Sequence, residues 1–180
     1  HPAGPGGPPL LPVRERGERI KHINCQIPKG GIAMKKLIGI FFLCIFCALL
    51  FLFASVPFIN DQIAEEVKND LIALPLPEKT QLVDSLSRAG KLVGNGNGMQ
   101  YFGAILIQSD LTQEELKNYY QKYAENEWTV VVKKQTGNFI EEVEHGGIRF
   151  TRGEDGVNYY IISSWGDSDY FLRDFDLRAH

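Results

Sequence analysis

The longest uncharged run in the chain extends from Leu37 to Ile59, 23 residues that directly follow Lys35 and Lys36. Hydrocarbon offers a peptide group no hydrogen-bond partner, so a run of this length predicts a helix whose backbone groups bond within the segment. At about 1.5 Å per residue this helix is roughly 34 Å long, enough to cross a hydrocarbon core of about 30 Å with some tilt. The run therefore predicts a transmembrane helix that contacts the lipid bilayer from Leu37 to Ile59.

The charges on the two sides of this run predict its orientation. Residues 1–36 carry seven Lys and Arg against two Glu, a net charge of +5, whereas four acidic residues and one lysine occupy residues 60–70. Because Lys and Arg are retained on the cytoplasmic side, the N-terminus is predicted to be cytoplasmic and residues 60–180 extracytoplasmic.

A cleaved signal peptide is the alternative to an uncleaved signal anchor. Signal peptides have an apolar stretch of about 7–15 residues and small residues before the cleavage site. Here the stretch is longer, and the segment from Phe53 to Phe58 has no Ala-x-Ala pattern. The sequence therefore favours the uncleaved anchor. Cys44 and Cys47 are interpreted as small membrane-embedded residues, because burial in hydrocarbon raises a thiol pKa and opposes redox chemistry.

The first 33 residues are rich in Pro and Gly and then basic, a composition that cannot bury a core. The first methionine is Met34, and Lys29-Gly30-Gly31 is encoded by codons that readily contain a ribosome-binding sequence. We expect residues 1–33 to be a disordered leader outside the native protein. A genuine disordered cytoplasmic tail is the alternative.

The rest of the chain predicts a linker followed by one domain. Ile63, Val67 and Leu71 recur at helical spacing within residues 61–73, and the prolines of Leu74-Pro75-Leu76-Pro77 end that helix. We therefore expect a basic flank and transmembrane helix at 34–59, a helical stalk at 60–77, and an extracytoplasmic domain at 78–180.

Local patterns within residues 78–180 predict an α+β domain. Thr112 and Glu115 have the spacing of a capping box, with Leu111 able to pack on Leu116, and so predict a helix over 113–125. Strands are expected at 81–93, 99–108, 128–134, 139–143, 148–152 and 157–165, with turns at 94–98 and 153–156. The order is β-β-α-β-β-β, with a fourth strand after the helix if 139–143 forms one, and it favours a small antiparallel sheet of about 4–6 strands with one helix packed on one face.

No catalytic, cofactor-binding or metal-binding residue is predicted. His145 lies among three glutamates but lacks the further His or Cys ligands of a zinc site, so we interpret it as a surface histidine. Ser163 and Ser164 lack a nucleophile elbow. The acidic pairs in Asp167-Ser168-Asp169 and Asp174-Phe175-Asp176 resemble only fragments of a cation loop. Residues 60–180 have a net charge of −8, which excludes nucleic acid as an expected partner.

Three segments together resemble a group of small single-pass, membrane-anchored proteins from Gram-positive bacteria: Leu74-Pro75-Leu76-Pro77-Glu78, Gly94-Asn95-Gly96-Asn97-Gly98-Met99-Gln100-Tyr101 and Asp176-Leu177-Arg178-Ala179-His180. The resemblance covers about residues 34–180. It implies location and architecture and no activity. It also draws attention to Arg178 and His180, which are expected to dock on the domain or to be recognised by a partner.

The leading hypothesis from sequence is a non-enzymatic, membrane-anchored domain that binds a protein, a cell-wall component or a cation at the cell surface. Its motivation is the anchor together with the lack of a complete catalytic set. The alternatives are a cell-surface hydrolase that uses carboxylates and His145, and a domain that depends on a weakly bound cation.

Overall fold

The computed structural model describes residues 30–94, 98–124, 129–137, 139–145, 147–152 and 158–179, with side chains from Met34 onward. The chain divides into two compact units, residues 1–42 and 43–180. The described part of the first unit is helical and forms the start of α1 (Gly30–Ala73). All other elements belong to the second unit.

Helix α1 contains both the apolar run and the helix over 61–73, which the sequence predicts as a continuation of the membrane helix. It continues through Pro57 without an interruption. The helix is long and apolar enough to span a membrane, and its most apolar part is exposed. This confirms a candidate transmembrane helix near the N-terminus.

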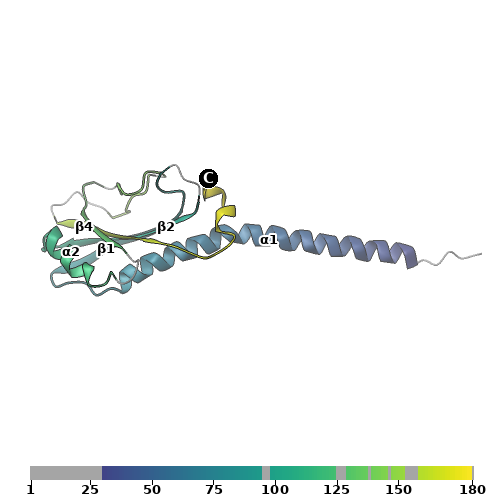
Figure 1. Ribbon diagram of the computed structural model, residues 1–180, viewed down its shortest axis with the longest axis horizontal. Coiled ribbons are helices and arrows are strands. Elements are labelled where there is room, and N and C mark those ends of the chain that lie inside the picture. The colour runs from purple at the N-terminus through teal and green to yellow at the C-terminus, as the bar shows by residue number, and fades with distance from the viewer. Residues whose placement is uncertain are drawn as a thin grey trace, which may run out of the picture. The chain divides into compact units, whose positions relative to one another are not determined.

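The sheet has four antiparallel strands in the order β1-β2-β4-β3 (Figure 1). They are β1 (Thr80–Gly90), β2 (Gln100–Ser109), β3 (Val130–Lys134) and β4 (Tyr159–Gly166). β1 and β2 form a hairpin in which Gly90 pairs with Gln100, and β2 pairs with β4 so that Tyr101 lies opposite Gly166. The predicted α+β class with a small antiparallel sheet is confirmed.

Helix α2 (Gln113–Gln121) begins at the predicted capping box. The Glu115 backbone N–H donates to Thr112 Oγ1 at 3.3 Å, and the Thr112 backbone N–H donates to Glu115 Oε2 at 2.8 Å. These two bonds satisfy backbone donors that a helix start leaves unpaired. Leu116 and Tyr120 form the buried side of α2.

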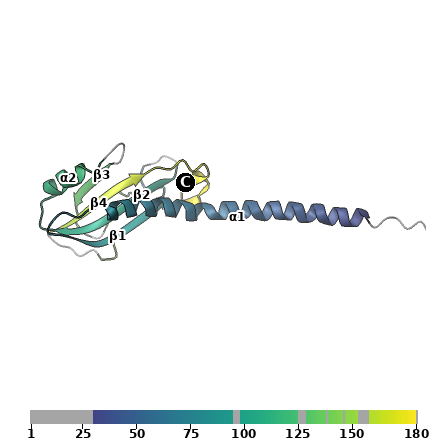
Figure 2. The same cartoon turned by 90° about the horizontal axis from the view of Figure 1, so that it is seen from below.

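Both faces of the sheet are covered, because the central strand β2 is buried along nearly its whole length. Ile105 and Ile107 pack against α2 and against Leu71 of α1. The opposite face of β2, with Phe102 and Leu106, packs against the connection between β3 and β4, which supplies Ile140, Val143, Ile148 and Phe150. Figures 1 and 2 show the C-terminal part of α1 running along the sheet beside α2.

The C-terminal part of α1 differs from the stalk expected at 60–77, because it is part of the domain core. Its buried residues are Val56, Asn60, Ala64, Val67 and Leu71, at most 6% exposed and spaced three or four apart. This spacing places them on one side of the helix. The buried residues of the domain therefore include part of α1 from Val56 onward, before the expected domain start at residue 78.

Two glycines allow this close packing of α1 on the sheet. A Cβ at Gly103 of β2 would lie 2.6 Å from the Lys68 backbone nitrogen and 2.8 Å from the Val67 carbonyl carbon. A Cβ at Gly166 of β4 would overlap with Val67 Cγ2. Only glycine lets the helix backbone lie at this distance from the strands.

The segment after β3 also differs from the sequence prediction. Residues 148–152 do not form a strand beside β4. Instead Phe139 and Arg149 make a single antiparallel bridge, and β4 pairs with β3. The predicted turn at 153–156 lies outside the described residues. Beyond β4 the chain forms two short 3-10 helices, η1 (Arg173–Phe175) and η2 (Leu177–Ala179).

Candidate functional site

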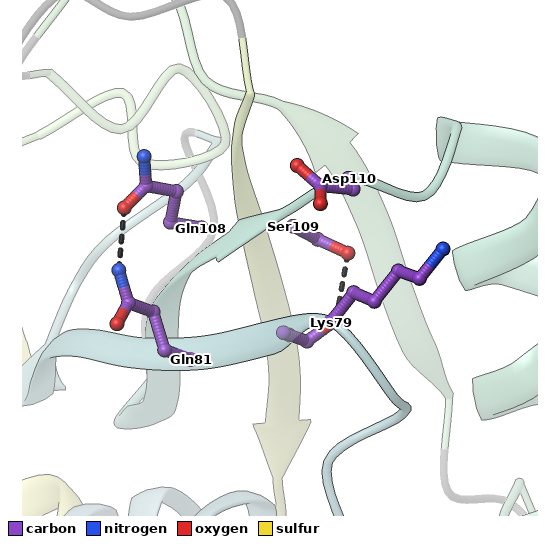
Figure 3. A pocket seen from close by; sticks show the side chains of 6 residues that line it. Lys79, Gln81, Gln108, Ser109 and Asp110 are labelled. Carbon is purple, nitrogen blue, oxygen red and sulfur yellow. Dashed lines mark hydrogen bonds between the residues drawn. The ribbon is translucent and has the colours of Figure 1, made fainter.

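The start of β1 and the end of β2 enclose a polar hollow of about 420 Å³ (Figure 3). It is lined by Lys79, Thr80, Gln81, Gln108, Ser109 and Asp110. Lys79 has a positive φ of 61°, a backbone conformation that residues other than glycine seldom adopt. This turn into β1 brings the Lys79 carbonyl oxygen to the Asp110 N–H, which donates to it at 3.2 Å.

Two side-chain pairs link the strands here, and because they are consecutive along the strands they lie on opposite faces of the sheet. Thr80 Oγ1 and Ser109 Oγ are 2.6 Å apart, and the Gln81 amide donates from Nε2 to Gln108 Oε1 at 2.6 Å. Within the described residues, Gln81 Oε1 and Gln108 Nε2 have no hydrogen-bond partner, so one acceptor and one donor remain at the two far ends of this bonded pair. The lining combines one cation, one anion and several neutral polar groups, a surface suited to hydroxyl and amide groups of a ligand.

A second polar cluster is buried where α1 meets the C-terminal segment. Asn60, fully buried, donates from Nδ2 to the Arg173 carbonyl oxygen and to Asp176 Oδ2, each at 3.1 Å, and accepts from the Tyr101 hydroxyl at 2.9 Å. Arg178 donates to Asp176 Oδ2 and to Asp61 Oδ1, each at 2.7 Å. It also donates to the Pro57 carbonyl oxygen at 3.0 Å.

The electrostatics of this second cluster hold Asp176 ionised. Burial alone would raise the pKa of the Asp176 carboxyl, but the hydrogen bonds from Arg178 and Asn60 outweigh it and lower the pKa to about 2. The same hydrogen bond from Arg178 to Asp176 raises the guanidinium pKa of Arg178 above its usual value. The ion pair of Asp176 with Arg178 therefore links η2 to α1, because Arg178 also bonds to Asp61 and to the Pro57 carbonyl oxygen.

The structure gives His145 and the neighbouring glutamates separate hydrogen-bond and ion-pair partners, although His145 and Glu144 both bond to Gly94. His145 Nε2 lies 3.1 Å from the Gly94 carbonyl oxygen, and its backbone N–H donates to Leu92. Glu144 accepts from the Gly94 N–H at 2.9 Å, and Glu142 pairs with Lys133 at 3.0 Å. These contacts give His145 and Glu144 a role in holding the loop after β1.

The acidic residues near the C-terminus are likewise engaged within the fold. Asp167 pairs with Arg173 at 2.7 Å, and Asp174 Oδ1 accepts from the Met99 N–H at 2.9 Å. In the described residues, no group of three or more His, Cys, Asp or Glu side chains is placed to hold a metal ion. The hydroxyls of Ser163 and Ser164 are buried. Among the residues that the structure describes, neither hydroxyl has a hydrogen-bond partner, so neither is bonded to a general base.

Sequence reasoning anticipated part of this arrangement. Arg178 docks on the domain through its bonds to Asp176, Asp61 and Pro57, one of the two alternatives that sequence analysis left open, whereas His180 lies outside the described residues. Two features were not predicted from the sequence. One is Asn60, the polar member of the buried side of α1, and the other is the hollow around Gln81 and Gln108. An asparagine four residues from the buried Val56 and Ala64 was the available signal for the first.

In comparisons with known proteins, the chain matches no family model, no curated protein and no solved structure.

Proposed function

We propose that this protein is a single-pass membrane protein whose α+β domain lies outside the cytoplasm and binds a neutral polar partner at the hollow around Gln81 and Gln108. The observation that supports the anchor most directly is exposure. Every side chain from Met34 to Ala54 is exposed, although the segment is almost entirely apolar. An apolar helix surface of this length is stable where hydrocarbon replaces water.

The orientation follows from charge. Lys35 and Lys36 precede the apolar run, and Asp61, Glu65 and Glu66 follow it. Retention of the lysines on the cytoplasmic side places the domain on the other side. The resemblance to small membrane-anchored proteins of Gram-positive bacteria is consistent with this placement.

The partner is argued from the chemistry of the hollow. The acceptor Gln81 Oε1 and the donor Gln108 Nε2, at the two ends of the bonded glutamine pair, complement the hydroxyl and amide groups of a glycan or peptide chain. The overall charge of −8 on residues 60–180 disfavours polyanions as ligands. A cell-wall polymer that contains sugar and peptide units meets these conditions.

The orientation is tested with protease added to intact cells that produce the full chain. We expect cleavage within residues 60–180, while a cytoplasmic marker protein stays intact until the cells are lysed. Protection of the domain in intact cells would contradict the orientation.

The binding site is tested by sedimentation of the full chain, in lipid nanodiscs, with purified cell-wall fragments. The double variant Gln81→Ala with Gln108→Ala removes both partners of one hydrogen bond and so leaves neither unsatisfied. We expect sedimentation of the wild type, and a loss of it in the double variant. Lys117→Ala on the exposed side of α2 is the matched control and should sediment like the wild type. Equal sedimentation of the wild type and the double variant would refute the site.

A further inference from the structure

Large apolar side chains are exposed on the C-terminal segment and on the neighbouring turn of α1. Phe171 is 81% exposed, Phe175 60% and Leu177 89%, and Phe58 of α1 is 74% exposed. Single exposed apolar residues are ordinary, but a concentration of four in one short segment and one adjoining helix turn is a feature of interaction surfaces. We refer to these four residues as the C-terminal apolar patch.

Hydrogen bonds fix the backbone that carries the patch. The Asn60 side chain donates to the Arg173 carbonyl oxygen, and the Arg178 side chain donates to the Pro57 carbonyl oxygen. These bonds flank Phe175 and Leu177 on both sides and connect them to the same turn of α1. The backbone is therefore fixed while the apolar side chains point away from the domain core.

The patch is continuous with the apolar run of α1. The rings of Phe175 and Phe53 are 5.6 Å apart in an edge-to-face arrangement. Phe53 lies six residues before Ile59, the end of the uncharged run, which corresponds to about 9 Å along the helix. A bilayer that covers the apolar run up to Ile59 therefore also reaches the level of Phe175.

We propose that the C-terminal apolar patch is inserted into the headgroup region of the bilayer that α1 crosses, so that the domain rests on the membrane surface at a fixed height. This inference rests on the proposed membrane anchorage. Apolar and aromatic side chains at such a boundary are typically buried about 5–10 Å into the headgroup and acyl region.

The lipid contact is apolar rather than electrostatic. The acidic residues Asp167, Asp169 and Asp174 lie on the same C-terminal segment, and the nearby Arg173 and Arg178 are paired with carboxylates. Anionic headgroups gain no attraction from such a segment. The insertion is therefore expected in a bilayer of neutral phosphatidylcholine and at high salt.

The experiment measures depth with bimane fluorescence on the full chain in phosphatidylcholine nanodiscs. Each protein carries one cysteine, Phe171→Cys, Leu49→Cys or Gln81→Cys, in a background with Cys25→Ala, Cys44→Ala and Cys47→Ala. Part of the lipid bears a nitroxide near the top of its acyl chain, which quenches only nearby fluorophores. We expect the label at 171 to lose about half of its fluorescence and the label at 81, on the hollow, to lose almost none.

The outcomes separate the inference from the anchorage on which it rests. Quenching at 49 without quenching at 171 leaves the anchor in place and overturns the inserted patch. A label at 49 that is not quenched in any nanodisc lipid overturns the anchor itself, and the patch with it. Bimane is apolar, so the label at 171 is also measured with Phe58→Ser, Phe175→Ser and Leu177→Ser. Quenching should then fall, and unchanged quenching would show that the label alone enters the lipid and would overturn the inference.

Discussion

The substitution Gly103→Ala tests the contact that places α1 on the sheet. An ideal Cβ at this position lies 2.6 Å from the Lys68 backbone nitrogen and 2.9 Å from Lys68 Cα. Ordinary contacts between such atoms are about 3.5–4.0 Å, so α1 must move away from β2 by about 1 Å. Because the obstructing atoms belong to a helix backbone, no side-chain rotation relieves the overlap.

The cost follows from the packing that this movement loosens. Ala64, Val67 and Leu71 are buried against the sheet, and overpacking in such a core typically destabilises by about 1–3 kcal/mol. We expect Gly103→Ala to lie near the upper end of that range. For a folded unit of this size, about 3 kcal/mol corresponds to a fall in Tm of about 12 °C.

The assay is thermal unfolding of the full chain in detergent, followed by near-ultraviolet circular dichroism, with Gly166→Ala as the matched variant. A Cβ at Gly166 overlaps with Val67 Cγ2 and lies at an ordinary contact distance of 3.7 Å from Tyr101 Cβ, so Val67→Ala should relieve much of the cost of Gly166→Ala and none of the cost of Gly103→Ala. A Tm for Gly103→Ala equal to that of the wild type would refute the packing of α1 on β2 at this position.

Three further predictions concern stability. Thr112→Ala removes the side-chain half of the capping box and should lower the free energy of unfolding by about 1 kcal/mol in urea denaturation, and an unchanged urea midpoint would contradict that role. Because the pKa of Asp176 is lowered to about 2 by bonds from Arg178 and Asn60 despite burial, its ionised form stabilises the fold above pH 4 and loses this effect as the pH falls toward 2. Asp176→Asn should therefore cost about 2 kcal/mol at pH 7 and little at pH 2, as measured by urea denaturation at each pH, and a cost that does not depend on pH would refute the ion pair. Burial raises the pKa of Tyr120 to about 12, so stability should decline between pH 10 and 12 in the wild type and less in Tyr120→Phe, and equal declines in thermal unfolding would contradict this.

Features that depend on neighbours in sequence could be predicted without the structure. The uncharged run from Leu37 to Ile59 predicted a long helix because only internal hydrogen bonds satisfy such a backbone in hydrocarbon. The capping box at Thr112 predicted the start of α2 because both of its bonds join residues three apart. The α+β class followed from the order of such local patterns.

Features that depend on contacts between distant segments were decided by the tertiary structure. The recurrence of Ile63, Val67 and Leu71 showed that one side of a helix is apolar, but the same spacing serves a stalk on a membrane and a core helix on a sheet. The close approach at Gly103 made it a core helix, and the bonds of Asn60 to the C-terminal segment depend on residues more than 110 positions away. Helical periodicity identifies which side chains leave water, whereas the partner that replaces the water is chosen by the packing of the whole chain.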